Sequence, residues 1–277
     1  MIYLLLAILG SSMISILLRL STGKIRANLS MVSFNYLACS LLGIAYSGFS
    51  SGALPLTGLP MALALGLTNG ILLLTSFILM QRSVPKNGVV LTSIFTKLGL
   101  LVPVALSVVV FRESPTLLQI LGFCIAVAAI ILINLNPDAS GRFDGSLIVL
   151  LLLAGGTDAM AKIYKALGPP ELSDPYLLFS FGAALGLALI GVAVKRERPG
   201  FWEFLFGTLI GIPNFLSSRF LLKALERIPA VVVYPTFSVS TLLLITLAGV
   251  LVFREKLRPR QWVALGAIII ALILLNI

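Results

Sequence analysis

Four charged side chains lie away from the ends of long apolar stretches of the sequence, where a charge is most costly. They are one acid, Asp158, and three bases, Lys97, Lys162 and Arg219. A charge at the middle of a bilayer costs roughly 2.5–3.5 kcal/mol on insertion scales, so such residues face a protein interior or a wet cavity. The chemistry open to them is charge neutralisation, proton binding and recognition of a charged solute.

Asp158 and Lys162 are four residues apart, so an α-helix places them on one face. Two interpretations stay open for this pair. It is either a structural pair that neutralises itself, or part of a site near the middle of the membrane that binds a substrate or a coupling ion.

The other charged residues differ in depth. Lys97 lies near the middle of its apolar stretch, which contains no acid, so Asp158 on another helix is its candidate partner. Alternatively Lys97 snorkels, which suits that depth poorly, or binds an anionic group of a substrate. Arg219 is nearer the end of a stretch and is expected to snorkel to the lipid headgroups. Glu113 ends a stretch, and we expect it to bond neighbouring arginine and loop amides.

Two asparagines occupy equivalent places in two of the stretches, as Gly66-x-x-Asn69 and Gly211-x-x-Asn214. An amide side chain in lipid needs a partner, so Asn69 and Asn214 either bridge helices or face a cavity.

Two aromatic positions are further candidates. Tyr234 precedes Pro235, which frees a backbone carbonyl and suits a helix that lines a cavity. Asn35 and Tyr36 follow Phe34 in an aromatic and polar cluster, which either stacks on a substrate or packs against another helix.

The composition indicates that these residues belong to a membrane protein. Of the 277 residues, 59% are hydrophobic and 11% are charged, whereas soluble domains carry roughly a quarter charged residues. The net charge of +10 does not indicate nucleic acid, because the basic residues lie in short clusters between apolar runs. The chain has no histidine, and both cysteines lie in apolar runs, so no metal site, disulfide or cofactor is predicted.

Ten apolar stretches are long enough to span a bilayer as α-helices. Three spacings within them allow close helix crossings, and these are Gly66-x3-Gly70, Gly182-x3-Gly186 and Gly207-x3-Gly211. The predicted spans are 2–20, 29–48, 59–81, 84–111, 115–135, 146–167, 174–194, 201–225, 229–253 and 259–277.

The two halves of the chain are related. Phe111-Arg112-Glu113 recurs as Phe253-Arg254-Glu255, 142 residues later, and polar matches recur at the same shift. Those matches are Gln119 with Gln261 and Asn134 with Asn276. The repeats are therefore predicted at 1–135 and 146–277, with 136–145 as a linker. Five helices in each repeat would insert them in opposite orientations, as in many secondary transporters.

The chain resembles the drug/metabolite transporter superfamily, in its paired EamA-domain type. The resemblance rests on two five-helix repeats, each of which ends its fourth helix in Phe-Arg-Glu and continues with a Gln. The resemblance implies an all-α polytopic fold of ten helices, arranged as two inverted repeats around a central cavity. It also implies a carrier for small solutes. Separately, the sequence has no phosphate-binding Gly-rich loop, no acid cluster and no histidine, so no enzyme activity is predicted. The first helix, around Ser11, is similar to that of the small multidrug resistance proteins, which carry a proton-coupling Glu there. Ser11 takes that place here, and the repeat matches Ser11 to Asp158.

The sequence therefore predicts a secondary active transporter that moves a small organic metabolite or drug by alternating access, by proton coupling or exchange. The alternatives are a lipid-carrier flippase and a membrane scaffold or sensor that transports nothing. The expected location is a prokaryotic inner membrane, as a monomer or homodimer in the lipid bilayer. The expected partners are a small-molecule substrate and protons as the coupling ion, with no nucleic acid.

Overall fold

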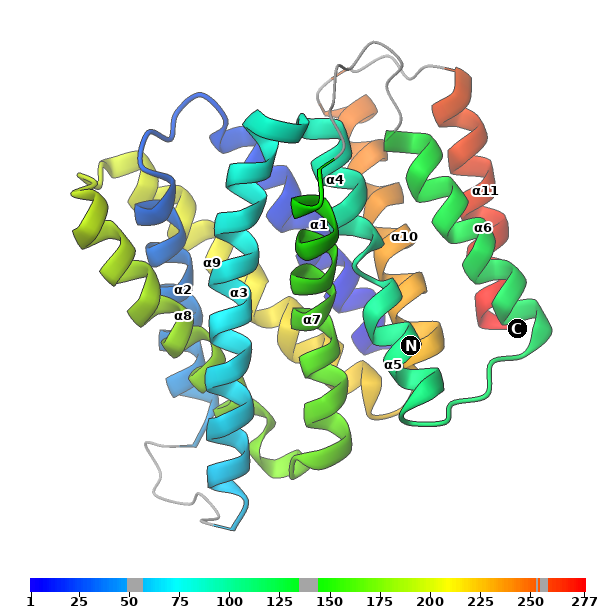
Figure 1. Ribbon diagram of the computed structural model, residues 1–277, viewed down its shortest axis with the longest axis horizontal. Helices are drawn as coiled ribbons and strands as arrows, with labels where there is room; N and C mark the ends of the chain where they lie inside the picture. Colours follow the sequence, from blue (N-terminus) through cyan, green and yellow to red (C-terminus); the bar gives the residue numbers. More distant parts are fainter. Residues whose placement is uncertain (49–56, 135–143, 253, 255–258) are drawn as a thin grey trace. The chain divides into compact units, whose positions relative to one another are not determined.

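The computed structural model of the chain describes all residues except 49–56, 135–143, 253 and 255–258, and the described residues are helical, without β-strands (Figure 1). The helices are α1 (Ile2–Ser21), α2 (Asn28–Tyr46), α3 (Leu59–Asn87), α4 (Val89–Leu98), α5 (Leu101–Val109), α6 (Leu117–Asn134), α7 (Ser146–Leu167), the short 3₁₀ helix η2 (Pro170–Leu172), α8 (Ser173–Lys195), α9 (Phe201–Leu225), α10 (Ala230–Leu251) and α11 (Pro259–Asn276).

The helices have the length and composition of membrane spans. Within the described ranges, nine segments are long and apolar enough to cross a bilayer, one of them running through α4 and α5 from Leu91 to Val109. A tenth apolar helix, Leu117–Ile133, is shorter. The prediction of an all-α polytopic membrane protein is thus confirmed, while the inverted orientation of the repeats stays a prediction.

The predicted helix over 84–111 is wrong, because the chain breaks twice in this region. Helix α3 continues past the expected end at 81 and through Pro85, and ends at Asn87. The next residue, Gly88, has a left-handed φ of 84° and precedes α4. A second break separates α4 from α5 (Figure 1). Pro103 has no N–H to offer the carbonyl of Gly99, which accepts the N–H of Val102 at 2.9 Å instead.

The chain forms two compact units, and each takes helices from both halves of the sequence. Unit 1 comprises Met1–Leu74 and Ile163–Glu226, and unit 2 comprises Thr75–Lys162 and Arg227–Ile277. The compact units are therefore not the two sequence repeats, whose bounds at 135 and 146 stay a prediction.

Unit 1 is built on helix pairs that approach closely. Helix α2 packs against both α8 and α9, and α1 packs along α9. Two glycines of α9 make the crossing with α2 possible. A Cβ atom on Gly207 would lie 2.5 Å from the carbonyl oxygen of Met31, and one on Gly211 would lie 2.6 Å from that of Asn35. The predicted close crossing at these glycines is therefore present. The prediction for Gly182 and Gly186 is wrong, because among the described residues a Cβ atom at either would meet nothing within 4 Å.

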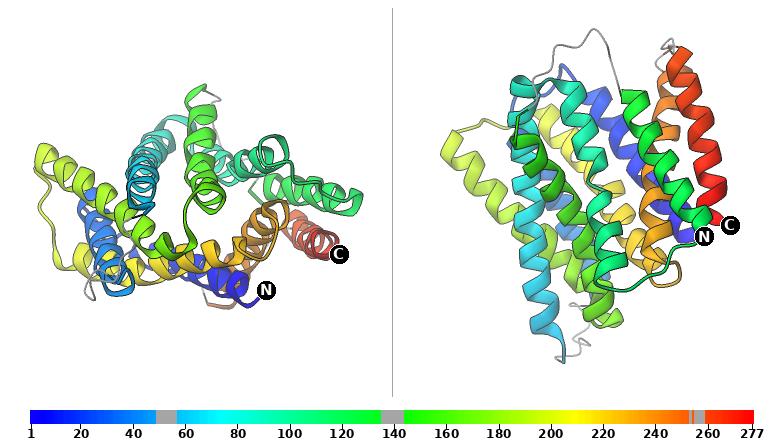
Figure 2. Two further views of the ribbon diagram at one scale, coloured as in Figure 1. Left: turned by 90° about the horizontal axis from the view of Figure 1, so that it is seen from below. Right: turned by 45° about the vertical axis from the view of Figure 1, so that its right-hand side comes forward.

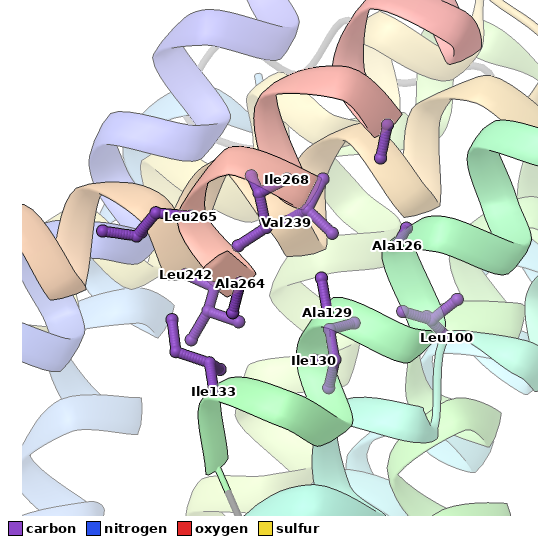
Figure 3. Close-up of a cluster of buried hydrophobic side chains, with 11 residues drawn as sticks. Leu100, Ala126, Ala129, Ile130, Ile133, Val239, Leu242, Ala264, Leu265 and Ile268 are labelled. Atoms are coloured by element: carbon purple, nitrogen blue, oxygen red, sulfur yellow. The ribbon is translucent and has the colours of Figure 1, made fainter. Parts of the chain in front are cut away.

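Unit 2 is built on α6 and α11, which run side by side and also contact α10 (Figure 2). Their contact surface is a cluster of buried apolar side chains, which includes Ala126, Ala129, Ala264 and Ala271 (Figure 3). Lipid is as apolar as these side chains, so helix association in a bilayer relies on close van der Waals packing rather than on a hydrophobic gain. The small alanines permit that packing.

Candidate functional site

The two charges predicted to interact, Lys97 and Asp158, lie within electrostatic range of each other in unit 2. Lys97 is at the end of α4 and Asp158 is on α7, and both are half-buried. The two charges come from the two halves of the sequence and attract each other through space.

The break between α4 and α5 positions this pair. Gly99 follows Lys97 by two residues and rests against Gly155, which is one helical turn before Asp158. A Cβ atom on Gly155 would lie 2.2 Å from the carbonyl oxygen of Gly99, so a side chain there would push the two segments apart. The close backbone approach brings the end of α4 to the depth of Asp158.

Tyr234 adds a third helix to this site. Its ring is buried, and its hydroxyl donates a hydrogen bond to the backbone carbonyl of Asp158 over 2.7 Å. Tyr234 lies on α10, directly before Pro235, which is inside that helix. Helices α4, α7 and α10 thus meet around Asp158.

Lys162 does not pair with Asp158, so the interpretation of these two residues as a self-neutralising pair is wrong. The ammonium group of Lys162 forms an ion pair with the Glu113 carboxylate beyond the end of α5, and also lies 5.1 Å from the centre of the Phe111 ring. Lys162 is one turn further along α7 than Asp158, which brings its long side chain to Glu113. The carboxylate of Asp158 is left to Lys97.

Glu113 also holds the start of α10. Its carboxylate accepts hydrogen bonds from the N–H groups of Ala230 and Val231, over 3.2 Å and 3.1 Å. These amides have no acceptor within their own helix, and the helix dipole favours a negative charge there. Glu113 therefore bonds a lysine and the amides of a helix, not the arginine and loop amides that we expected.

The residue before Glu113 has an unusual backbone. Arg112 has a φ of 54°, in the left-handed region, and Arg254 has the same value at the equivalent place 142 residues later. The motif shared by the two halves thus also shares its backbone conformation at the arginine. Phe253 and Glu255 of the second copy lie outside the described residues.

Unit 1 contains the predicted amide side chains, and each joins two helices. The side-chain amide of Asn69 on α3 donates to the hydroxyl of Ser180 on α8 over 3.2 Å. Asn214 on α9 donates to the side-chain oxygen of Asn35 on α2 over 3.1 Å, and the Cys39 thiol also bonds that oxygen. Asn35 and Asn214 are half-buried, whereas Asn69 is buried.

The ring of Tyr36 is buried in unit 1 and packs against Phe181 of α8, with 6.2 Å between the ring centres. The sequence left open whether this aromatic cluster stacks on a substrate or packs against another helix. The structure has a packing contact for Tyr36. Phe34 meets the ring of Phe204 edge to face, at 5.3 Å.

Arg219 forms an ion pair, which we did not expect. Its guanidinium group donates two hydrogen bonds to Asp174 at the start of α8, over 2.6 Å and 2.9 Å, and it lies 4.2 Å from the centre of the Tyr46 ring. No pattern in the sequence predicts this pair, because Asp174 lies at the end of its apolar stretch and not inside it.

One acid outside the spans has a clear partner. The ammonium group of Lys86 at the end of α3 bonds the exposed carboxylate of Asp144, and this hydrogen bond holds the pKa of Asp144 below its usual value. Asn87 and Ser146 bond each other beside it, over 3.2 Å. Both contacts tie α3 to the start of α7.

The part of the chain that the structure describes has no group of three or more acidic or cysteine side chains that could hold a metal ion. In unit 2 the functional groups are one acid within range of one amine, a tyrosine hydroxyl and a second ion pair. In such an arrangement, a proton or a cation can replace the Lys97 ammonium group beside the Asp158 carboxylate. The same groups can also bind a charged solute.

Three comparisons with known proteins bear on this site. Residues 145–277 match the EamA-like transporter family. An uncharacterised protein of Haemophilus influenzae is 25% identical over 275 residues, which cover 95% of this chain and 93% of that protein. The quaternary ammonium compound-resistance protein QacC of Staphylococcus aureus is 28% identical over 96 residues, which cover 34% of this chain and 88% of QacC.

The fold also has a counterpart among solved structures. A protein known from a crystal structure superposes with a TM-score of 0.75 at 16% identity, over 99% of this chain and 94% of that one. At this identity the likeness concerns the fold alone.

Proposed function

We propose that the chain is a secondary active transporter, because residues 145–277 match the EamA-like transporter family and the chain has many membrane spans. It moves a small organic solute across the bilayer by alternating access. The family match supports a transporter and not an enzyme, and the membrane spans supply the bilayer as its surroundings. The proposal also names the residues that bind the solute, the ion that drives its transport and the chemical class of the solute.

The observation that carries the proposal is the Lys97–Asp158 pair. Two charges half-buried inside spans are costly to maintain, and intramembrane ionisable residues are typically found on substrate and ion pathways. Asp158 is the proposed carboxylate for substrate or coupling ion, and Lys97 neutralises it when neither is bound. A proton or a cationic solute that binds Asp158 would release the Lys97 ammonium group, which gives the two states that alternating access requires.

The same pair supports a class of solute to test first. An organic cation would replace the ammonium group of Lys97 at Asp158. The name of the similar protein QacC, which refers to resistance to quaternary ammonium compounds, points to the same chemistry. Efflux of organic cations by proton exchange is therefore the form of transport that we propose. An anionic solute would instead be bound by Lys97.

The other candidate residues have supporting roles in this proposal. Tyr234 orients α7 at Asp158, and Lys162 holds the end of α5 through Glu113. The half-buried amides of Asn35 and Asn214 are proposed to hold α2 against α9 within unit 1. Asn69 and Tyr36 are proposed as packing contacts, because both are buried against α8.

We also propose that the two repeats are inverted and that the protein resides in the inner membrane of a prokaryote. The matching left-handed backbone at Arg112 and Arg254 supports a structural repeat. Five helices per repeat support opposite orientations. The bacterial sources of two similar proteins support the location.

The function is tested with purified protein in proteoliposomes. Organic cations and anionic metabolites are first screened for those that raise the melting temperature of the protein. Each hit is then loaded inside the vesicles, and its release is measured with and without a pH gradient. The proposal expects release that the protein accelerates and the gradient drives. Stabilisation without release would contradict transport, and movement of lipid-linked sugars alone would indicate a flippase.

A further inference from the structure

A groove on unit 1 lies between α2 and α8 and has a volume of about 130 Å³. Its two walls are stripes of side chains at helical spacing. The wall from α2 consists of Ser33, Phe34 and Leu37, and the wall from α8 consists of Leu185, Leu189 and Val192. Ser30 and Pro199 lie at one end, which we call the mouth.

The interior of the groove offers nothing to a polar solute. The hydroxyl of Ser33 donates to the carbonyl of Leu29 over 2.9 Å, and that of Ser30 donates to Glu197 over 3.1 Å. Leu37 and Leu189 are exposed, so the groove opens on the face of the helices that meets lipid. From Ser30 to Leu37 the helix rises about 10 Å. This length and polarity fit one hydrocarbon chain.

The mouth lies where the membrane surface is expected, because α2 begins at Asn28 and α8 ends at Lys195. Two carboxylates tie the flanking segments together. Glu197 accepts the N–H of Ser30 over 2.9 Å, and Glu203 accepts the N–H of Arg26 over 2.8 Å. Both acids are therefore occupied by helix and loop amides.

The same two segments carry a group of exposed basic side chains, which we call the basic mouth. Lys24 also lies 4.8 Å from the centre of the Trp202 ring, and tryptophan is enriched at the level of lipid headgroups. The members of the basic mouth are Lys24, Arg26, Lys195, Arg196 and Arg198.

We propose that unit 1 binds one anionic phospholipid at this place. Its headgroup phosphate lies among the basic mouth, and one of its acyl chains lies in the groove between α2 and α8. The charge of the mouth selects an anionic headgroup, because a basic residue near the surface attracts anionic lipid. The apolar groove selects a lipid over a free phosphate. This site is separate from the proposed transport residues, and its test does not depend on transport.

The experiment uses the purified full-length protein in detergent and measures its melting temperature as phospholipid is added. Phosphatidylglycerol is the probe, and phosphatidylcholine with the same acyl chains is the comparison. Phosphatidylglycerol should raise the melting temperature at a half-saturating concentration at least tenfold below that of phosphatidylcholine. Glycerol 3-phosphate, which lacks the acyl chains, should have no effect.

Two variants test the two parts of the site separately. Lys24→Gln/Lys195→Gln/Arg198→Gln should weaken phosphatidylglycerol binding at least tenfold. The matched control removes three exposed basic residues elsewhere, as Arg82→Gln/Arg112→Asn/Arg254→Asn, and should bind like the natural protein. Leu189→Trp fills the groove and should weaken binding at least tenfold, whereas Leu187→Trp, on an exposed face of α8 outside the groove, should not.

Equal stabilisation by the two lipids would overturn the proposal. So would unchanged phosphatidylglycerol binding by either the triple charge variant or Leu189→Trp. If a variant fails to fold, mass spectrometry of the natural protein decides. The proposal expects one phosphatidylglycerol molecule retained per chain after delipidation in mixed vesicles. Retention of phosphatidylcholine in the same proportion would overturn it.

Discussion

The Lys162 ammonium group and the Glu113 carboxylate form an ion pair that joins α7 to the end of α5, while the same carboxylate accepts two amides at the start of α10. Both side chains are mostly buried, with 13% and 16% of their surfaces exposed. Three helices of unit 2 therefore depend on one acid. Since α7 carries Asp158 and α10 carries Tyr234, this contact also sets the geometry of the proposed site.

Replacing Glu113 should destabilise the protein more than replacing both partners. Glu113→Gln leaves the Lys162 ammonium group without a counter-charge and weakens the bonds at α10. We expect a loss of about 3 kcal/mol in the free energy of unfolding. Glu113→Gln/Lys162→Met should lose less unfolding free energy than the two single variants lose together, because the double variant leaves no unpaired buried charge. Denaturant unfolding in micelles gives the four values of this cycle, and purely additive losses would refute a direct interaction.

The planar guanidinium group of Arg219, and not only its charge, is predicted to stabilise the protein. Arg219→Lys keeps the positive charge but cannot make both bonds to Asp174 or stack on Tyr46 in the same way. The expected loss in unfolding free energy is about 1–2 kcal/mol. Lys223→Arg, one turn along α9, serves as the matched control and should change stability by less than about 0.5 kcal/mol. Equal stability of Arg219→Lys and the natural protein would argue against the bidentate contact.

Gly155 is predicted to be irreplaceable, because α7 and the α4–α5 break touch through their backbones there. Gly155→Ala places a methyl group 2.2 Å from the carbonyl oxygen of Gly99, so the segments must separate. We expect a loss of at least about 1–3 kcal/mol in stability and a higher KM for transport. Gly186→Ala in α8 meets open space and should be neutral or stabilise by up to about 1 kcal/mol. Similar behaviour of the two variants would rule out the close approach.

The charged pair itself can be tested through stability. Lys97→Gln and Asp158→Asn each leave one half-buried charge without its counter-charge, whereas the double variant leaves none. The double variant should therefore have a larger free energy of unfolding than the sum of the two single losses predicts, by about 1 kcal/mol or more. Thermal and denaturant unfolding of the four proteins supply the cycle. Absence of coupling would mean that Lys97 serves another partner, such as an anionic solute.

The sequence predicted the helical segments well, because apolar length and Gly-x3-Gly spacing are local signals. It placed Lys97 with Asp158, since two opposite charges in lipid leave few other partners. It failed for Arg219 with Asp174, because Asp174 lies at the end of its apolar stretch, where an acid needs no partner inside the membrane. It also failed at α4 and α5, because the effect of Pro103 on the Gly99 carbonyl is masked by a continuous apolar run.

Lys162 illustrates why spacing alone misled. A separation of four residues put it on the face of Asp158, but its long side chain reaches Glu113, a residue that the sequence placed at the membrane surface. The compact units could not be predicted either. They mix helices of both halves, and the repeat describes similarity along the chain, whereas the units follow packing.

The central claim is that Asp158 carries the substrate or the coupling ion. The most direct measurement is pH-driven release of a stabilising organic cation from proteoliposomes by the Asp158→Asn protein. Asp144→Asn is the matched control, because it makes the same change in an exposed acid outside the spans. We predict that Asp158→Asn inserts and folds but loses at least 99% of the transport rate, while Asp144→Asn keeps it. Transport by Asp158→Asn at the natural rate would contradict the assignment.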